Sequence, residues 1–360
     1  MHGTDPSSGS SHVGGVAGDY IVSSRNTFLS GGGYNRHNFE LRGTPCYFFE
    51  LHGNVMLEGI GDSIENDGSA TKLIVTADNR FSAPNPTDHL GKGDFDGDRK
   101  EDLFLATGAA WYYAPGGSAE WRFLNNMTTL SGSLLFGDFD GDGRTDVFTQ
   151  SGRDWLVSWG GTSPWEKINE SDAQMPDFVI GDFDGDGRSD VFYADGHQWR
   201  SSRGGVEAFE FLNYSSYRVP DLRFGDFDGD GRTDVFGIEA NQWSVSYGGT
   251  GQWSPLAHTL TSSVAGLMVA DFDGDGRADI ATFVPVFSYP FPVTAALKIA
   301  FASASDWATV GRFTSPVPLA AIGRFSGAAG ADILMWNQNY LSILVGGTGT
   351  PQRWSLQDMR

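Results

Sequence analysis

Short apolar runs separated by turn residues fill the middle of the chain. Residues 134–136 form one such run, and residues 147–149 form the next after a polar loop. Trp155, Val157 and Trp159 alternate with their neighbours, which predicts a strand with all three on one face. A fourth run, residues 165–168, follows the glycine pair at 160–161. Four short strands with turn signals about every 8–12 residues predict one antiparallel sheet.

This unit repeats along the chain with a period of 44 residues. Equivalent tryptophans stand at Trp111, Trp155, Trp199 and Trp243, and glycine pairs recur at 116–117, 160–161, 204–205 and 248–249. A fifth copy carries an insertion around 284–293, and a sixth copy ends near Trp354. One such sheet cannot bury both of its faces alone, so copies must stack. The pattern therefore predicts an all-β fold, a β-propeller of six or seven four-stranded blades over residues 91–360.

Residues 1–90 form a β-rich N-terminal segment without this rhythm. Runs at 47–51 and 72–76 favour strands, but no acidic loop accompanies them. The segment can supply an extra blade, a strand that closes the ring, or the tail of a preceding domain. Under the third alternative, segments at 38–43 and 52–57 resemble the last coils of a parallel β-helix.

A nine-residue acidic loop links the first two predicted strands of each unit. Five copies begin at Asp94, Asp138, Asp182, Asp226 and Asp271, and four of them read DFDGDGR(T/S/A)D. Carboxylates at loop positions 1, 3, 5 and 9 supply oxygen ligands, position 7 offers a backbone carbonyl, and glycine at position 6 suits a sharp turn. This donor set favours Ca²⁺ over Mg²⁺, and the absence of His and Cys disfavours Zn²⁺.

The predicted ligands of about five Ca²⁺ sites follow from these positions. They are Asp94, Asp96, Asp98 and Asp102; Asp138, Asp140, Asp142, Arg144 and Asp146; Asp182, Asp184, Asp186, Arg188 and Asp190; Asp226, Asp228, Asp230, Arg232 and Asp234; and Asp271, Asp273, Asp275, Arg277 and Asp279. Turn formation alone explains one Asp-Gly loop, but not five copies with all four carboxylates. The ions are expected to act mainly as structural staples of each blade.

The spacing separates this loop from helical calcium hands. Those place their last acidic ligand at position 12 before a helix, whereas here position 9 is followed by a strand such as Val147-Phe148. The loops resemble the FG-GAP/VCBS repeat family, which includes the integrin α-subunit head and some fungal and bacterial lectins. The resemblance covers about Lys92 to Arg360 and implies a calcium-loop propeller that acts in binding.

Two copies of the loop depart from the pattern. In the first, Arg99 replaces the glycine of position 6 and Lys100 replaces arginine. A left-handed backbone at a non-glycine residue costs about 1 kcal/mol, so the Asp94 loop is predicted to bind Ca²⁺ most weakly. In the sixth copy, Arg324 and its neighbours keep only Asp332 of the four carboxylates, which predicts a blade without an ion.

The strong acidity of the chain follows from the same loops. The formal net charge is −21, and the five loops hold 20 of the 45 acidic residues. Five divalent ions would offset about ten charges. No basic stripe suggests nucleic acid as a partner. The single Cys46 excludes an intrachain disulfide, and no apolar stretch approaches the length of a membrane span.

Calcium loops of low affinity operate outside cells, so an extracellular or cell-surface location is expected. The N-terminal residues show no signal peptide, which suggests a fragment or a processed piece of a larger protein. The resemblance favours a recognition module that binds a glycan or cell-surface glycoconjugate, with a protein ligand as the alternative. Trp121, Trp165 and Trp253 follow glycine turns and are candidates to pack on a sugar, whereas Trp155, Trp199 and Trp243 are assigned to the core.

Catalysis is a contrasting hypothesis, because some polysaccharide lyases are built on propellers and β-helices suit lyases and hydrolases. The candidate residues would be His37, Arg42, His52, Asp62, Glu65, Tyr193 and His197. They form no recognisable triad, carboxylate pair or metal motif. The sequence therefore assigns no catalytic residue and leaves enzymatic activity undecided, with a binding role preferred.

Overall fold

A computed structural model describes residues 90–354 of this chain, apart from 107–109, 119–120, 251, 287–293, 304, 315–318, 338–339 and 349. It also describes the backbone of short strands between residues 3 and 82. The fold in the described residues is all-β, with 3-10 turns but no α-helix. No helix in this part of the chain is long and apolar enough to cross a membrane.

Residues 90–354 form six four-stranded antiparallel sheets. Blade 1 contains β11 (Leu90–Gly93), β12 (Asp102–Ala106), β13 (Trp111–Ala114) and β14 (Arg122–Asn125). Blade 2 contains β15 (Leu135–Gly137), β16 (Asp146–Ser151), β17 (Asp154–Ser158) and β18 (Glu166–Glu170). Blade 3 contains β19 (Phe178–Gly181), β20 (Asp190–Ala194), β21 (Gln198–Ser202) and β22 (Glu210–Tyr214).

The other three blades repeat the same order. Blade 4 contains β23 (Arg223–Gly225), β24 (Asp234–Glu239), β25 (Gln242–Ser246) and β26 (Ser254–Pro255). Blade 5 contains β27 (Met268–Ala270), β28 (Asp279–Val286), β29 (Thr294–Ala300) and β30 (Ala308–Thr314). Blade 6 contains β31 (Leu319–Gly323), β32 (Asp332–Asn337), β33 (Tyr340–Leu344) and β34 (Gln352–Arg353).

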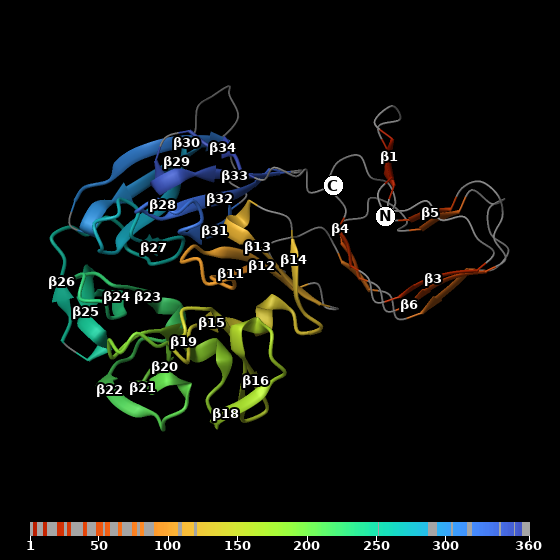
Figure 1. Cartoon of the computed structure of the whole chain (residues 1–360). Helices are drawn as coiled ribbons and strands as arrows, with labels where there is room; N and C mark the ends of the chain where they lie inside the picture. Colours follow the sequence, from red (N-terminus) through yellow and green to blue (C-terminus); the bar gives the residue numbers. More distant parts are fainter. Residues whose placement is uncertain are drawn as a thin grey trace.

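The blades form a ring with their first strands toward the centre (Figure 1). The ring closes where blade 6 meets blade 1. The backbone N–H of Glu101 donates to the Arg324 carbonyl (3.0 Å), and Trp354 Nε1 donates to the Gly116 carbonyl (2.6 Å). The prediction of a propeller is confirmed, and the number of blades is six. Because the ring closes within residues 90–354, a seventh blade from the N-terminal segment is not needed.

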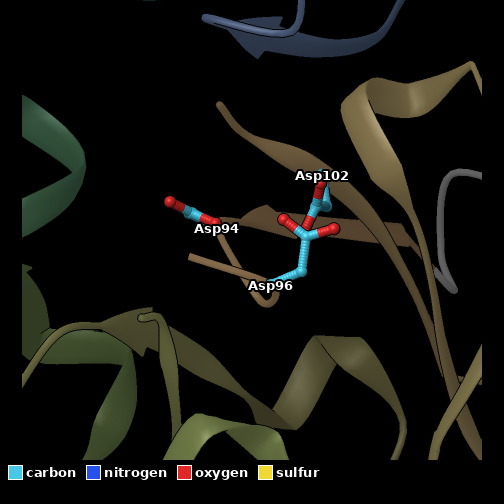
Figure 2. Close-up of side chains that lie close together, drawn as sticks. All are labelled: Asp94, Asp96 and Asp102. Atoms are coloured by element: carbon cyan, nitrogen blue, oxygen red, sulfur yellow. The ribbon is translucent and has the colours of Figure 1, made fainter. Parts of the chain in front are cut away.

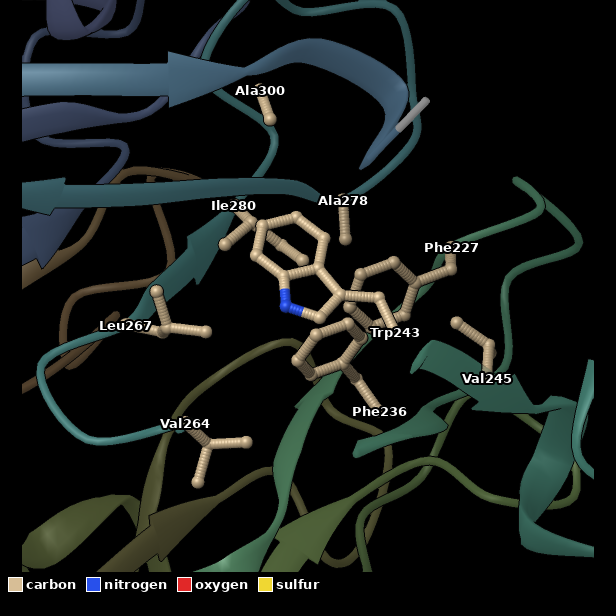
Figure 3. Close-up of a cluster of buried hydrophobic side chains, with 9 residues drawn as sticks. All are labelled: Phe227, Phe236, Trp243, Val245, Val264, Leu267, Ala278, Ile280 and Ala300. Carbon is tan, nitrogen blue, oxygen red and sulfur yellow. The ribbon is translucent and has the colours of Figure 1, made fainter. Parts of the chain in front are cut away.

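The core lies between the blades, where each blade covers the next. Trp243 of β25 is fully buried beside Phe236 and Phe227, and residues of blade 5 such as Ile280 pack on the other side of its ring (Figure 3). The equivalent Trp111, Trp155 and Trp199 are also fully buried. Their assignment to the core is confirmed. Large aromatic side chains bury 150–250 Å² each, which is why a flat sheet can fill the wedge between two blades.

One detail of the predicted strands is wrong. The alternation predicts that the strand of Trp155 and Val157 continues through Trp159, but β17 ends at Ser158. Trp159 instead begins a 3-10 turn, η4 (Trp159–Gly161), in which Gly160 has φ 55°. The left-handed backbone turns the chain out of the strand direction, so Trp159 is only partly buried.

The described strands between residues 3 and 82 pair differently from the blades. They are β1 (Gly3–Asp5), β2 (Ser10–His12), β3 (Tyr20–Ser24), β4 (Thr27–Leu29), β5 (Phe39–Leu41), β6 (Phe48–His52), β7 (Val55–Leu57), β8 (Ile64–Asn66), β9 (Ile74–Ala77) and β10 (Arg80–Ser82). β1 and β2 form an antiparallel pair, whereas β3-β6-β9, β4-β7-β10 and β5-β8 pair in parallel. Tyr20 pairs with Phe48, 28 residues on, and Phe49 pairs with Ile74, 25 residues on.

Candidate metal centres

The first aspartate organises each acidic loop through its own carboxylate. In the second loop, Asp138 Oδ1 accepts hydrogen bonds from the backbone N–H groups of Gly141 (2.7 Å) and Asp142 (3.2 Å), and Oδ2 accepts one from Gly143 (2.9 Å). An Asp side chain that caps its own loop fixes a tight turn. The turn brings the later carboxylates of the loop close to the first.

The glycines at positions 4 and 6 have left-handed backbones. Gly141 has φ 78° and Gly143 has φ 86°, and the equivalent glycines of the other full loops have similar values. In the first loop Arg99 takes φ 68°. The expectation of a left-handed backbone at Arg99 is confirmed, and its strain costs about 1–2 kcal/mol.

The aspartate at position 9 is the most deeply buried acid of the loop. Asp190 is 0% exposed and accepts hydrogen bonds from the backbone N–H groups of Phe183 (2.9 Å) and Gly204 (2.9 Å). Burial raises the pKa of Asp190 to about 6, although the two hydrogen bonds oppose the shift. The pKa values of Asp102, Asp146, Asp234 and Asp279 are raised to about 6 for the same reason.

The sixth loop separates the structural role of position 9 from metal binding. Asp332 is 0% exposed and accepts hydrogen bonds from the backbone N–H groups of Ser326 (2.7 Å) and Gly346 (2.9 Å). The other three carboxylates are missing from this loop. The position-9 aspartate therefore joins the acidic loop to the glycine-pair turn of its blade whether or not the loop has a full ligand set.

Three carboxylates per loop come together into groups that could hold a metal ion. In each group, one oxygen from each residue lies within 4.8 Å of the others. The groups are Asp94, Asp96 and Asp102; Asp138, Asp140 and Asp146; Asp182, Asp184 and Asp190; Asp226, Asp228 and Asp230; and Asp271, Asp273 and Asp279. Figure 2 shows the first group.

The donors in these groups suit a hard divalent cation. In the first group Asp96 Oδ1 is buried and has no hydrogen-bond partner among the described residues. An unpaired buried carboxylate oxygen is costly unless a cation lies beside it. Every side-chain donor is an oxygen, which is the ligand type that Ca²⁺ prefers. The residues present therefore fit the predicted ion.

The position-5 carboxylate belongs to such a group only at Asp230. The equivalent Asp98, Asp142, Asp186 and Asp275 lie outside the groups. In the third loop, Arg188 at position 7 donates to Asp186 Oδ2 from Nε (3.0 Å) and Nη2 (2.5 Å). The guanidinium thus competes for a carboxylate that was predicted as a ligand. The role of the position-7 carbonyls stays a prediction.

Backbone hydrogen bonds connect successive loops around the ring. In each case the N–H of position 8 donates to the position-1 carbonyl of the preceding blade. The pairs are Thr145 to Asp94, Ser189 to Asp138, Thr233 to Asp182, Ala278 to Asp226, Ala331 to Asp271 and Glu101 to Arg324, at 2.5–3.0 Å. A loop ordered by an ion therefore supports its neighbour as well as its own blade.

Glu101 is a residue whose role the sequence did not reveal. Its Oε2 accepts a hydrogen bond from the Arg324 backbone N–H (2.8 Å), and its Oε1 accepts one from Lys92 Nζ (2.5 Å). The other loops carry a small residue at position 8. The larger residue occurs only where blade 1 must join blade 6 without a continuous chain. The exception is visible when the copies of the repeat are aligned, but its role follows only from the contact between blades 1 and 6.

Basic side chains face two carboxylates of the first loop. Arg122 Nη1 lies 3.5 Å from Asp96 Oδ2, and Lys100 Nζ lies 2.9 Å from Asp98 Oδ2. The third loop has equivalent ion pairs, Arg203 with Asp184 and Arg188 with Asp186, so these contacts do not set the first loop apart. Weaker binding at the Asp94 loop stays a prediction that rests on Arg99.

Exchanging the position-6 residues tests this prediction. We expect Arg99→Gly to raise the free energy of unfolding by about 0.5–1 kcal/mol and to tighten Ca²⁺ binding at the first loop, because the strain disappears while glycine's chain entropy takes part of the gain. The reciprocal Gly143→Arg should weaken the second loop. A Cβ at Gly143 would meet nothing within 4 Å, so its φ of 86° isolates the backbone effect. Calorimetric Ca²⁺ titration of both variants measures this; unchanged affinities would contradict it.

A lower pH should reduce the stabilisation of the fold by Ca²⁺. In the folded chain without Ca²⁺ the position-9 pKa values are about 6, above the usual aspartate value of 3.8, so the folded state binds more protons than the unfolded state between these values. Their contribution to stability falls as pH rises through this window. Ca²⁺ binds the deprotonated carboxylates, so the rise in Tm on adding Ca²⁺ should be larger at about pH 7 than at about pH 5. Equal increments at both pH values would refute this.

The candidate ligand-binding tryptophans are partly used in packing. Trp165 contacts Trp111 of the preceding blade edge to face (centroids 5.4 Å apart), and Trp253 contacts Trp199 in the same way (5.5 Å). Trp121 packs against the cluster that joins blades 1 and 6. All three are partly buried. Their contact with a sugar stays a prediction, but each ring already spans an interface between blades.

The candidate catalytic residues in blade 3 do not share one environment. Tyr193 packs on Phe178 and Phe209, whereas the side chain of His197 is 88% exposed, with Nδ1 3.8 Å from Asp195 Oδ1. The remaining candidates, His37, Arg42, His52, Asp62 and Glu65, have side chains outside the described residues.

Comparisons with known proteins agree with this architecture. The FG-GAP-like repeat family matches residues 94–149, 138–193 and 226–282. Among solved structures, an Agrocybe aegerita lectin that recognises non-reducing terminal N-acetylglucosamine is 16% identical, with a TM-score of 0.50; the match covers 75% of this chain and 80% of the lectin. The Vibrio cholerae biofilm matrix protein Bap1 is 17% identical, with a TM-score of 0.29, over 63% of this chain and 39% of Bap1. The search of curated proteins found no match.

Proposed function

Because the chain carries FG-GAP-like repeats on a six-bladed β-propeller, we propose that it is a calcium-stabilised extracellular recognition module for glycans. The observation that carries the calcium part is the recurrence of the carboxylate group in five blades. In each group, every carboxylate has an oxygen within 4.8 Å of the other two. Negative charges this close repel one another, and a divalent cation bound between them would relieve the repulsion.

Glycans are the favoured ligand for a physical and a comparative reason. Aromatic side chains provide flat apolar faces for pyranose rings, and this propeller repeats them blade by blade. Similar subsites on one rigid ring would also raise avidity for multivalent glycans. A lectin that shares the fold recognises terminal N-acetylglucosamine, which makes this sugar the first probe. A protein ligand is the alternative outcome.

We also propose that residues 1–90 are a separate unit that precedes the propeller at 91–360. The parallel pairing of three sets of strands with constant steps of 28 and 25 residues supports a stack of coils rather than a blade. In such a stack each strand pairs with its equivalent one coil later.

A glycan array in the presence of Ca²⁺, repeated with a chelator, tests the proposed function. We expect calcium-dependent binding to a defined group of glycans, with N-acetylglucosamine-terminated structures among the probes. Binding to no glycan, together with capture of a protein ligand from the cell surface, would replace the lectin assignment with a protein-binding role. Release of unsaturated products from an acidic polysaccharide would favour a lyase instead.

A further inference from the structure

One position differs from blade to blade on an otherwise repeated scaffold. It is the first residue of the turn from the third strand to the fourth, directly before the glycine pair or, in blade 5, before Ala302-Ser303. The residues are Pro115, Trp159, Arg203, Tyr247, Phe301 and Val345. In the first four blades the residue before this position is small, alanine in blade 1 and serine in blades 2–4, and the glycine pair follows the varied residue in each. Four of these side chains, Trp159, Tyr247, Phe301 and Val345, pack against the core of their blades and are only partly buried. The position therefore combines a packing contact with a partly exposed side chain that can select a ligand.

This position lies at the rim of the metal loop. The glycine that follows it donates its backbone N–H to the position-9 aspartate, as Gly160 does to Asp146 Oδ1 (2.7 Å). The side chain also reaches the loop itself. In blade 3, Arg203 Nε lies 3.3 Å from Asp184 Oδ2, a carboxylate at position 3. A ligand that contacts the varied residue would therefore lie beside the loop.

Blade 2 combines an aromatic face with a hydrogen-bonding partner at this rim. Trp159 is partly buried, and its Nε1 donates to Glu166 Oε2 (2.8 Å). Glu166 is exposed, and Trp159 Nε1 is its only hydrogen-bond partner among the described residues. The indole is thus held in one orientation by an acid with a second oxygen available. In blade 3 the equivalent acid, Glu210, is instead paired with Arg203 (3.0 Å).

The charge around Trp159 determines which ligand would fit. Glu166 supplies a carboxylate at this rim, and no described arginine or lysine forms an ion pair with it. Asp140 of the adjacent loop is a candidate Ca²⁺ ligand, so a bound ion would offset its charge and Glu166 is the remaining acid beside the indole. Carboxylate oxygens accept hydrogen bonds from hydroxyl groups but repel anionic sugars. The rim of blade 2 therefore suits a neutral sugar.

We propose that Trp159 and Glu166 form a subsite for a neutral pyranose on blade 2, beside the Asp138 loop. The apolar face of the sugar packs on the indole, and its hydroxyl groups donate to Glu166. The proposal rests on the proposed glycan-binding function and adds a location and a ligand class to it. Blade 4 offers a partial equivalent, because Tyr247 supplies an aromatic ring but Ser254 replaces the acid.

The experiment first screens the full chain with Ca²⁺ on an array of neutral and acidic oligosaccharides. The best-bound neutral glycan is then titrated by calorimetry against the wild type and variants of the subsite. We expect Trp159→Ala to weaken binding on the order of tenfold or more, Glu166→Gln to weaken it less, and Trp159→Phe to retain most of it. Tyr214→Ala is the control, because it removes a highly exposed aromatic ring of β22 that lies outside the proposed subsite, and it should change the affinity least.

The outcomes separate this proposal from the broader one. No glycan binding by the wild type would overturn both the lectin function and the subsite. Glycan binding that survives both Trp159→Ala and Glu166→Gln would overturn the subsite alone. A preference for acidic over neutral glycans would also overturn it. If Trp159→Ala does not fold, Glu166→Gln and saturation transfer from the protein to the ligand's ring protons, with and without Trp159→Phe, decide the question.

Discussion

Chelation of Ca²⁺ should lower the Tm of the full chain by about 10 °C or more, the largest effect that we expect. Each ion bound only by the folded state contributes about 2.7 kcal/mol at a free concentration 100 times its Kd. For a domain of this size, 1 kcal/mol corresponds to about 2–4 °C. Five carboxylate groups recur around the ring, and backbone hydrogen bonds link each loop to the next. The losses should therefore accumulate.

Differential scanning calorimetry with Ca²⁺, with Mg²⁺ and with chelator measures this effect. Mg²⁺ is the matched control for charge, because it demands a smaller octahedral site and gives up its water reluctantly. It should restore only a small part of the lost Tm. A Tm that does not change on chelation would eliminate the ions as structural staples.

The second large effect concerns the position-9 aspartates. Asp190→Ala leaves the buried N–H groups of Phe183 and Gly204 without their acceptor. Each unsatisfied buried donor costs about 1–3 kcal/mol, so we expect a loss of about 2–6 kcal/mol in the free energy of unfolding. The variant should also bind one Ca²⁺ fewer, because Asp190 belongs to the third carboxylate group.

Asp332→Ala is the matched control, since Asp332 makes the same two kinds of hydrogen bond in the loop without the other carboxylates. It should lose a similar amount of stability but no Ca²⁺. Chemical denaturation with and without Ca²⁺, together with the calorimetric stoichiometry, distinguishes the two variants. A change in stoichiometry in Asp332→Ala, or none in Asp190→Ala, would contradict this division of roles.

Much of the fold could be predicted because the same sequence pattern recurs several times along the chain. A period of 44 residues fixes the blade, and the alternation around Trp155 fixes which face is buried. The left-handed backbone at Arg99 also followed from the sequence, since the other loops carry glycine there. A pattern that is weak evidence for a strand or turn in one copy becomes strong evidence when it recurs at the same spacing in the others.

Other features could not be predicted because they depend on contacts between blades. No sequence pattern indicates that Trp165 lies edge-on against Trp111 of the preceding blade. The alternation predicts a strand that continues through Trp159, but β17 ends at Ser158, before the turn that contains the left-handed Gly160. Periodicity describes a strand and does not show where the strand stops.

The sequence by itself determined the repeat, the blade and the carboxylate set, because each is encoded within one copy of the unit or by comparison of neighbouring copies. Only the tertiary structure decided that six blades close the ring, that Glu101 joins its ends, and that the position-9 aspartates are buried hydrogen-bond acceptors as well as candidate ligands. Ring closure depends on the angle between packed blades, and burial depends on which neighbour covers a carboxylate. Both are properties of segments far apart in the chain, which no local pattern specifies.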